Sequence, residues 1–221
     1  MRRGRKAGAD LSTHGAGRDR VELLATVLLS LATVATAWSG YQATRWNGEQ
    51  AKAGARANAA RIESVKASGL ANTQTEIDVA TFTQWVNAYA QHQAQLRDFY
   101  ARRFRKEFKP AVAAWIATKP LQNANAPLTP FAMPQYRLAA RTEADDLNAK
   151  AEASALAALR DIQRSTNYVL CVVLFASALF FAGMSTKLVT PRLRIVMLSV
   201  GCAVFLGTAV WIAVSPVSLS V

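Results

Sequence analysis

The stretch LLATVLLSLATVATAWSGYQAT, residues 23–44, decides the fold because it contains no Asp, Glu, Lys or Arg. A helix of about 18–20 such residues is long enough to cross ~30 Å of hydrocarbon. Residues 165–186 and 195–221 are two further uncharged stretches of sufficient length. The sequence therefore predicts an all-α membrane protein with three transmembrane helices, at residues 21–41, 167–186 and 195–214.

The composition agrees with a membrane protein. The chain has 221 residues with 26 Lys+Arg against 14 Asp+Glu, a formal net charge of +12, and 52% of it is hydrophobic. Its mean hydropathy is +0.10. This apolar content excludes a disordered chain, and its concentration in uncharged blocks argues against a soluble domain with amphipathic elements.

The cations near the span ends predict the orientation. Cations are abundant in residues 1–20 and in the short hairpin 187–194, and three spans place both segments on one side. The positive-inside rule puts that side in the cytoplasm, and residues 42–166 outside. Trp38, Tyr41 and Tyr168 sit at the loop-side interface, as aromatic anchors do. Cations also flank the loop, and a long loop crosses regardless of charge, so the inverted topology stays open.

The N-terminal segment allows two interpretations. Residues 1–20 are basic and contain several glycines, which predicts a disordered tail. The first span could instead be a removable signal, because Ala35-Thr36-Ala37 mimics a small-residue cleavage site. The uncharged stretch is longer than a usual signal core, which favours a retained span.

Residues 42–166 are expected to form a helical bundle. From Leu70 to Ala182 there is no glycine, and no proline precedes Pro110. Clustered prolines predict a non-helical connection at 119–135. The arm before it is much longer than the arm after it, so we expect a bend, best placed at Ser68–Asn72, before the capping-box pair Thr73 and Glu76. An uninterrupted helix is the alternative.

Small residues suggest where helices meet. The Ala-rich stretches 51–60 and 149–158 are equally distant from their spans and are expected to touch. In the first span a candidate helix-packing face is formed by Thr26, Ser30, Thr33, Ala37 and Gly40. A pore lining would use similar residues, but no span interior carries a charge, which favours packing.

No constellation of catalytic residues is apparent. The two histidines, His14 and His92, have no Cys or His at metal-ligand spacing, and Cys171 and Cys202 both lie within spans. There is no phosphate-binding glycine loop and no nucleophile elbow. We therefore expect no enzyme activity, no metal site and no cofactor.

The segment 97–109 interleaves cations with aromatic residues on an expected helix. Such a helix can lie on an anionic lipid surface, which makes candidates of Arg102, Arg103, Arg105, Lys106 and Lys109. Alternatively, Phe99, Phe104 and Phe108 enter the bundle core and the cations are solvated. An extracytoplasmic loop argues against nucleic-acid binding, despite the basic balance.

The run ATVATAWSGYQATRW, residues 32–46, followed by a helical loop and two C-terminal spans, resembles uncharacterised bacterial membrane proteins of unknown function. The resemblance implies this order of spans and no activity or functional residue.

Three functions are compatible with this sequence. The leading hypothesis is a non-enzymatic inner-membrane protein in the lipid bilayer whose bundle mediates homo-oligomerisation or docking of a membrane-protein partner. The alternatives are a sensor-like ligand-binding bundle without its own output domain, and a small oligomeric channel lined by the first span.

Overall fold

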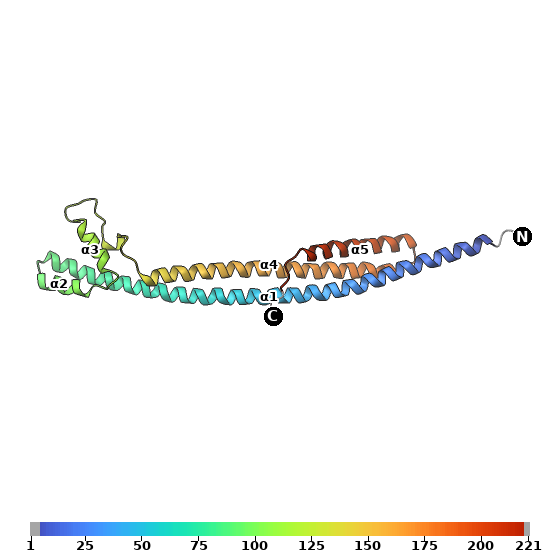
Figure 1. The fold of residues 1–221 in the computed structure, drawn as a ribbon, viewed down its shortest axis with the longest axis horizontal. Coiled ribbons are helices and arrows are strands. Elements are labelled where there is room, and N and C mark those ends of the chain that lie inside the picture. The colour runs from blue at the N-terminus through green and yellow to red at the C-terminus, as the bar shows by residue number, and fades with distance from the viewer. Residues whose placement is uncertain (1–4, 219–221) are drawn as a thin grey trace. The chain divides into compact units, whose positions relative to one another are not determined.

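The computed structural model describes the backbone of residues 5–218 and the side chains of residues 21–218. It confirms the all-α fold, because this part of the chain contains helices and no strand (Figure 1). The helices are α1 (Arg5–Ala90), α2 (Ala94–Arg103), α3 (Lys109–Ala117), the 3-10 turn η1 (Pro130–Ala132), α4 (Ala139–Lys187) and α5 (Pro191–Ala213).

Three helices are long and apolar enough to cross a membrane: α1 from Val21 onward, α4 and α5. The expected spans 21–41, 167–186 and 195–214 fall within or end next to these helices. Because α1 begins at Arg5, its backbone includes most of the expected tail. The side chains of residues 1–20 lie outside the described ones, so the disordered tail stays a prediction.

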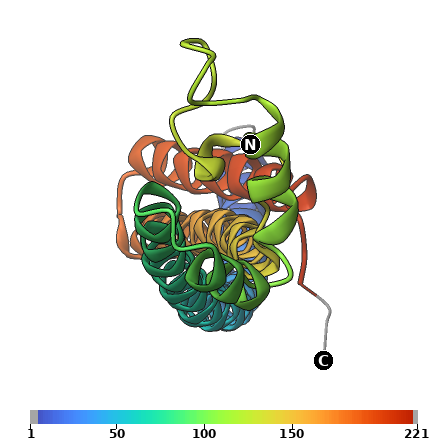
Figure 2. The ribbon, with the colours of Figure 1, turned by 90° about the vertical axis from the view of Figure 1, so that its left-hand side faces the viewer.

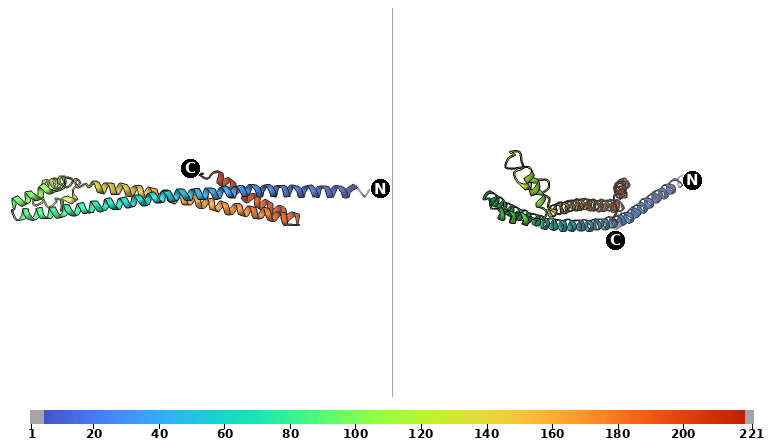
Figure 3. Two further views of the ribbon diagram at one scale, coloured as in Figure 1. Left: turned by 90° about the horizontal axis from the view of Figure 1, so that it is seen from below. Right: turned by 60° about the vertical axis from the view of Figure 1, so that its left-hand side comes forward.

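The chain divides into two compact units. The span unit comprises Met1–Ala53 and Leu156–Val221, and the head unit comprises Gly54–Ala155. Both units contain part of α1 and part of α4, and within each unit these two helices run side by side (Figures 1 and 3).

In the span unit, α1 packs through small side chains. Ala25, Leu28 and Ala32 are buried, and the first two form a cluster with Ala182 of α4 and Leu198 of α5. The α4 and α5 helices approach closely at Gly201, where a Cβ would lie 3.3 Å from the Ala178 carbonyl oxygen. A side chain at this crossing would push the two helices apart by a few tenths of an ångström, so glycine favours their close approach.

Hydrogen bonds fasten the loop-side end of the span unit. The Ser165 hydroxyl donates to the Ala43 carbonyl at 3.0 Å, and the Tyr168 hydroxyl donates to the Pro216 carbonyl at 3.0 Å. The Ser218 amide donates to Oε1 of buried Gln42 at 3.0 Å. These bonds tie α1, α4 and the segment after α5 together.

The predicted packing face of the first span is wrong for contacts within the chain. Thr26, Ser30, Thr33 and Ala37 are not buried and Gly40 is half-buried, because α1 uses the neighbouring Ala25–Ala32 side instead. Both sides carry small residues, so residue size alone did not distinguish them. The exposed hydroxyls donate to carbonyls four residues earlier, at 2.8–3.0 Å: Thr26 to Glu22, Ser30 to Thr26 and Thr33 to Leu29.

In the head unit, α1 and α4 meet through a seven-residue repeat of mostly small side chains. Ala57, Ser64 and Ala71 are buried on α1 at seven-residue spacing, with Ala67 between the last two, and α4 buries Ala140, Ala144 and Ala151. The Ser64 hydroxyl donates to the Ala144 carbonyl at 2.8 Å. This spacing is that of a coiled-coil seam. Ala57 belongs to the Ala-rich stretch 51–60 and Ala151 to the stretch 149–158, the two stretches that we expected to touch.

The expected bend at Ser68–Asn72 is wrong, because α1 continues through Gly69 to Ala90. A glycine costs a helix about 1 kcal/mol relative to alanine. Packing against α4 on both sides of Gly69 offsets that cost, through the Ser64 contact and an Arg141–Asn72 hydrogen bond of 2.8 Å.

The chain reverses instead at His92, whose φ is 56°. The amide of His92 donates to the Tyr89 carbonyl at 3.1 Å, and the amide of Gln93 donates to the Ala88 carbonyl at 2.9 Å. This pair of bonds is a Schellman motif, which usually places glycine in the left-handed position. Histidine tolerates that conformation better than most residues, so the turn forms without glycine or proline.

Candidate functional site: a buried ion pair and an aromatic groove in the head unit

The head unit is built on an aromatic core. Phe82, Phe104 and Phe108 are buried with Ala111 and Val112. Phe108 is central: its ring centroid lies 5.2 Å from Phe104 and 5.0 Å from the stacked ring of Phe131. Aromatic pairs at such separations contribute beyond the area they bury. The cluster therefore holds α1, α3 and the connection that follows α3 together.

The segment 97–109 is not one helix, which corrects the sequence expectation. α2 ends at Arg103, and Phe104 has extended backbone angles (φ −54°, ψ 138°) before α3 begins at Lys109. This break turns Phe104 and Phe108 into the core, as the alternative interpretation proposed, whereas Phe99 stays exposed.

The candidate anionic-surface residues separate into two groups. Arg105 is half-buried and forms ion pairs with Asp78 and Glu107, so it is not available to a surface. The exposed ones are Arg102, Arg103, Lys106 and Lys109. The guanidinium of Arg103 lies 3.6 Å above the Phe99 ring.

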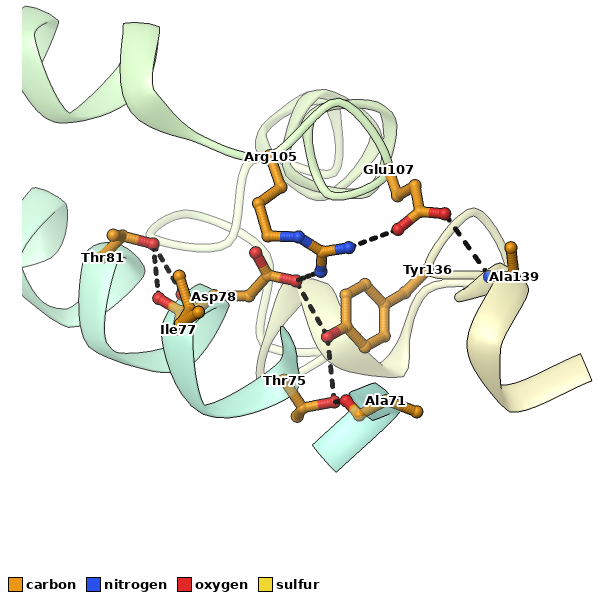
Figure 4. A network of polar contacts seen from close by, with 9 residues as sticks. All are labelled: Ala71, Thr75, Ile77, Asp78, Thr81, Arg105, Glu107, Tyr136 and Ala139. Atoms are coloured by element: carbon orange, nitrogen blue, oxygen red, sulfur yellow. Dashed lines mark hydrogen bonds and ion pairs between the residues drawn. The ribbon is translucent and has the colours of Figure 1, made fainter. Parts of the chain in front are cut away.

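A polar network lies beside the aromatic core (Figure 4). Asp78 on α1 is fully buried; Nη1 of Arg105 donates to its Oδ2 at 2.9 Å, and the Tyr136 hydroxyl to the same oxygen at 3.1 Å. Arg105 also pairs with Glu107, and Oε1 of Glu107 accepts from the Ala139 amide at 3.4 Å. The network thus links α1, the chain before α3, and the start of α4.

Burial governs the electrostatics of this network. Loss of solvation raises the pKa of Asp78, although Arg105 and Tyr136 act to lower it. Burial likewise raises the pKa of Tyr136. Within the described part of the chain, Oδ1 of Asp78 is buried and has no hydrogen-bond partner. Because this carboxylate is sealed from solvent, it positions segments of the head unit and cannot meet a substrate.

A groove of about 230 Å³ lies on the other side of the aromatic core, which we call the head groove. α1 contributes Trp85, Val86 and Tyr89, and the other lining residues are Trp115, Ile116, Lys119, Pro120, Leu121 and Gln122. Figure 2, viewed onto the head unit, shows the connection after α3 looping away from the helices.

Phe82 is buried in the aromatic core, whereas Val86 and Tyr89, further along the same helix, are exposed in the groove. The sequence did not indicate that Trp85, Trp115 and Lys119 line one groove. The turn at His92 brings α1 and α3 together, and that turn was not predicted. The one available signal was two tryptophans far from any span end, Trp85 and Trp115.

Among the side chains of residues 21–218, no group of three or more His, Cys, Asp or Glu is placed to hold a metal ion. In comparisons with protein-family models, curated proteins and solved structures, nothing matches this chain.

Proposed function

We propose that this chain is a non-enzymatic bacterial inner-membrane protein whose helical bundle mediates homo-oligomerisation or docks a membrane-protein partner. In this proposal the N-terminus is cytoplasmic and the head unit lies outside. The supporting observation is an apolar surface on the part of α1 that belongs to the head unit.

Four of the large apolar side chains that are exposed on that part of α1 lie on one side of the helix: Ile62, Val65, Leu70 and Ile77, here called the outer stripe. At about 100° per residue they fall within an arc of roughly 140°. The arc faces away from the seam that α1 forms with α4 through Ser64 and Ala71. A helix that is apolar on two opposite sides has a second surface to cover.

The stripe lies beyond the predicted span, so lipid does not cover it. Two copies anchored in one membrane would bring their stripes together in parallel, and a partner with an apolar helix would cover the stripe in the same way. Lys66 and Glu76 fall within the same arc at about 100° per residue, so such a contact would include charged side chains beside the apolar ones.

The mass of the protein in nanodiscs tests the proposal. We expect an oligomer or a co-purifying partner, and Val65→Asp should reduce the complex to the single chain. Leu128→Asp is the matched control, because Leu128 is an exposed apolar residue outside the stripe. A wild-type chain that is strictly monomeric and without a partner would contradict the proposal, as would an unchanged mass for Val65→Asp.

The orientation is tested separately with a single cysteine at exposed Gln122, in a chain whose Cys171 and Cys202 are replaced by alanine. A membrane-impermeant maleimide should label it in intact cells. Labelling only after lysis would invert the topology and place the exposed cations of α2 in the cytoplasm.

A sensor-like ligand-binding bundle is the second candidate function, and the head groove is the observation that favours it. Such a sensor would signal through a membrane-protein partner. A ligand-dependent rise in the melting temperature of the head unit would support it.

A further inference from the structure

We propose that the head groove binds a small aromatic monocarboxylate, with its ring against Trp85 and Trp115 and its carboxylate on the ammonium group of Lys119. None of the residues that line the groove belongs to the outer stripe.

The volume of the groove suits a ligand with one aromatic ring. An apolar cavity of about 150 Å³ holds one benzene molecule. The groove, at about 230 Å³, therefore has room for one ring and a short acidic side chain. Pockets that enclose drug-sized ligands begin near ~300 Å³, so the groove fits a smaller ligand better.

The aromatic walls are fixed by contacts outside the groove. The buried Phe82 ring stacks on Trp85 at 5.9 Å and meets Trp115 edge-on at 5.4 Å. Nε1 of Trp115 donates to the Pro127 carbonyl at 2.7 Å, which sets the orientation of that indole. Trp85 also stacks on Tyr89 at 5.7 Å. Walls held in this way lose little side-chain entropy when a ring binds against them.

The charge of the groove selects an anion. Of the side chains that the structure describes, Lys119 is the only charged one lining the groove, and no carboxylate faces it there. Aromatic walls alone would suit a cation. The Lys119 ammonium would repel a cation, and it supplies the charge-assisted hydrogen bond that a carboxylate requires.

The backbone gives a second reason to assign Lys119 to binding. Its φ is 50°, and its amide donates to the Ile116 carbonyl at 3.0 Å, so it occupies the left-handed position after α3. Glycine is preferred there because a Cβ is disfavoured. A lysine in this conformation lowers stability relative to glycine, and such strain is concentrated at functional sites.

The test is isothermal titration of the full chain in zwitterionic nanodiscs with 3-phenylpropanoate, with empty nanodiscs as the blank. The cation of matched shape, 3-phenylpropylamine, is the control ligand. We expect saturable binding of the carboxylate and none of the amine. Lys119→Gly should weaken carboxylate binding at least about tenfold, while the melting temperature of the head unit stays equal or rises.

Two further variants distinguish a loss of ligand binding from a loss of folding. Lys119→Gln should lose binding by the same factor as Lys119→Gly, and Lys119→Arg should retain it within about threefold. The proposal is overturned if the carboxylate shows no saturable binding, if the amine binds equally well, or if Lys119→Gly binds like the wild type. A disulfide between two copies carrying Leu121→Cys would also overturn it, by showing that a second copy covers the groove.

Discussion

Val34 and Val65 are two valines on α1, and their side chains are exposed to nearly the same extent, 69% and 71%. Val34 lies in the predicted first span, where the surrounding hydrocarbon accepts it at no cost. Val65 lies in the head unit on the outer stripe, where water surrounds any side chain that has no partner. Exposed apolar area therefore marks an interface only where water is the solvent.

The two units are also held together differently. The span unit relies on close approach at Ala25, Ala182 and Gly201, which suits lipid because dispersion contacts replace the hydrophobic effect. The head unit has the aromatic core around Phe108 and the ion pair of Asp78 with Arg105. Each kind of contact is therefore effective in its own solvent.

The largest effect is expected for Phe108→Ala, which should destabilise the head unit by about 3–5 kcal/mol. Phe175→Ala removes an equally buried ring from the span unit, next to Phe205. Its cost should be smaller by about 2 kcal/mol, since lipid removes the transfer term. Thiol labelling of Ala111→Cys and of native Cys171 reports the opening of the two units. Equal losses would contradict the difference between their solvents.

Val34→Asp should cost about 3 kcal/mol in membrane insertion, because an aspartate at the centre of a span is strongly disfavoured. Val65→Asp should change folding stability by less than about 0.5 kcal/mol, as surface substitutions do. Protease protection of the first span measures the former, and thermal melting measures the latter. If both substitutions impair insertion, the boundary between lipid and water lies further along α1 than we infer.

Asp78→Ala should destabilise the head unit by about 3 kcal/mol, since it leaves Arg105 and the Tyr136 hydroxyl without their shared partner. The partial exposure of Arg105 keeps the loss at this level. Asp98→Ala is the matched control: Asp98 forms an exposed pair with Arg97 and should contribute at most about 0.5 kcal/mol. Comparable losses in the two variants would show that burial does not set the strength of these pairs.

The smallest expected effect is a pH dependence. Because burial raises the pKa of Asp78 above 3.8, the folded state binds this proton more tightly than the unfolded state. The contribution of Asp78 to stability therefore falls as the pH rises from the unfolded pKa through the folded one.

Chemical denaturation of the wild type and of Asp78→Asn at a series of pH values measures this dependence. The unfolding free energy of the wild type minus that of the variant should be largest in acid and should decrease as the pH rises. Arg105, Glu107 and Tyr136 face position 78 in both proteins, so their own titration largely cancels in the difference. A difference that grows with pH would indicate a lowered pKa.

Uncharged length made the spans predictable from sequence, and clustered prolines indicated an irregular connection, which the structure has between α3 and α4. The Ala-rich stretches indicated where α1 and α4 meet, but the positions of the seam at Ala57, Ser64 and Ala71 were harder to find, because alanines also occur on the exposed sides of α1. The reversal at His92 uses no glycine or proline. Without the position of that turn, the contacts between α1 and α3 cannot be predicted, and these include the contacts that form the head groove.

The hydroxyls of Thr26, Ser30 and Thr33 have a consequence for permeation. Each one already donates its proton to a carbonyl of its own helix, so only oxygen lone pairs face outward. Chloride and other anions need donors, which this face lacks, whereas a desolvated cation needs acceptors. If copies of α1 ever enclosed a conducting path with this face, it would select cations.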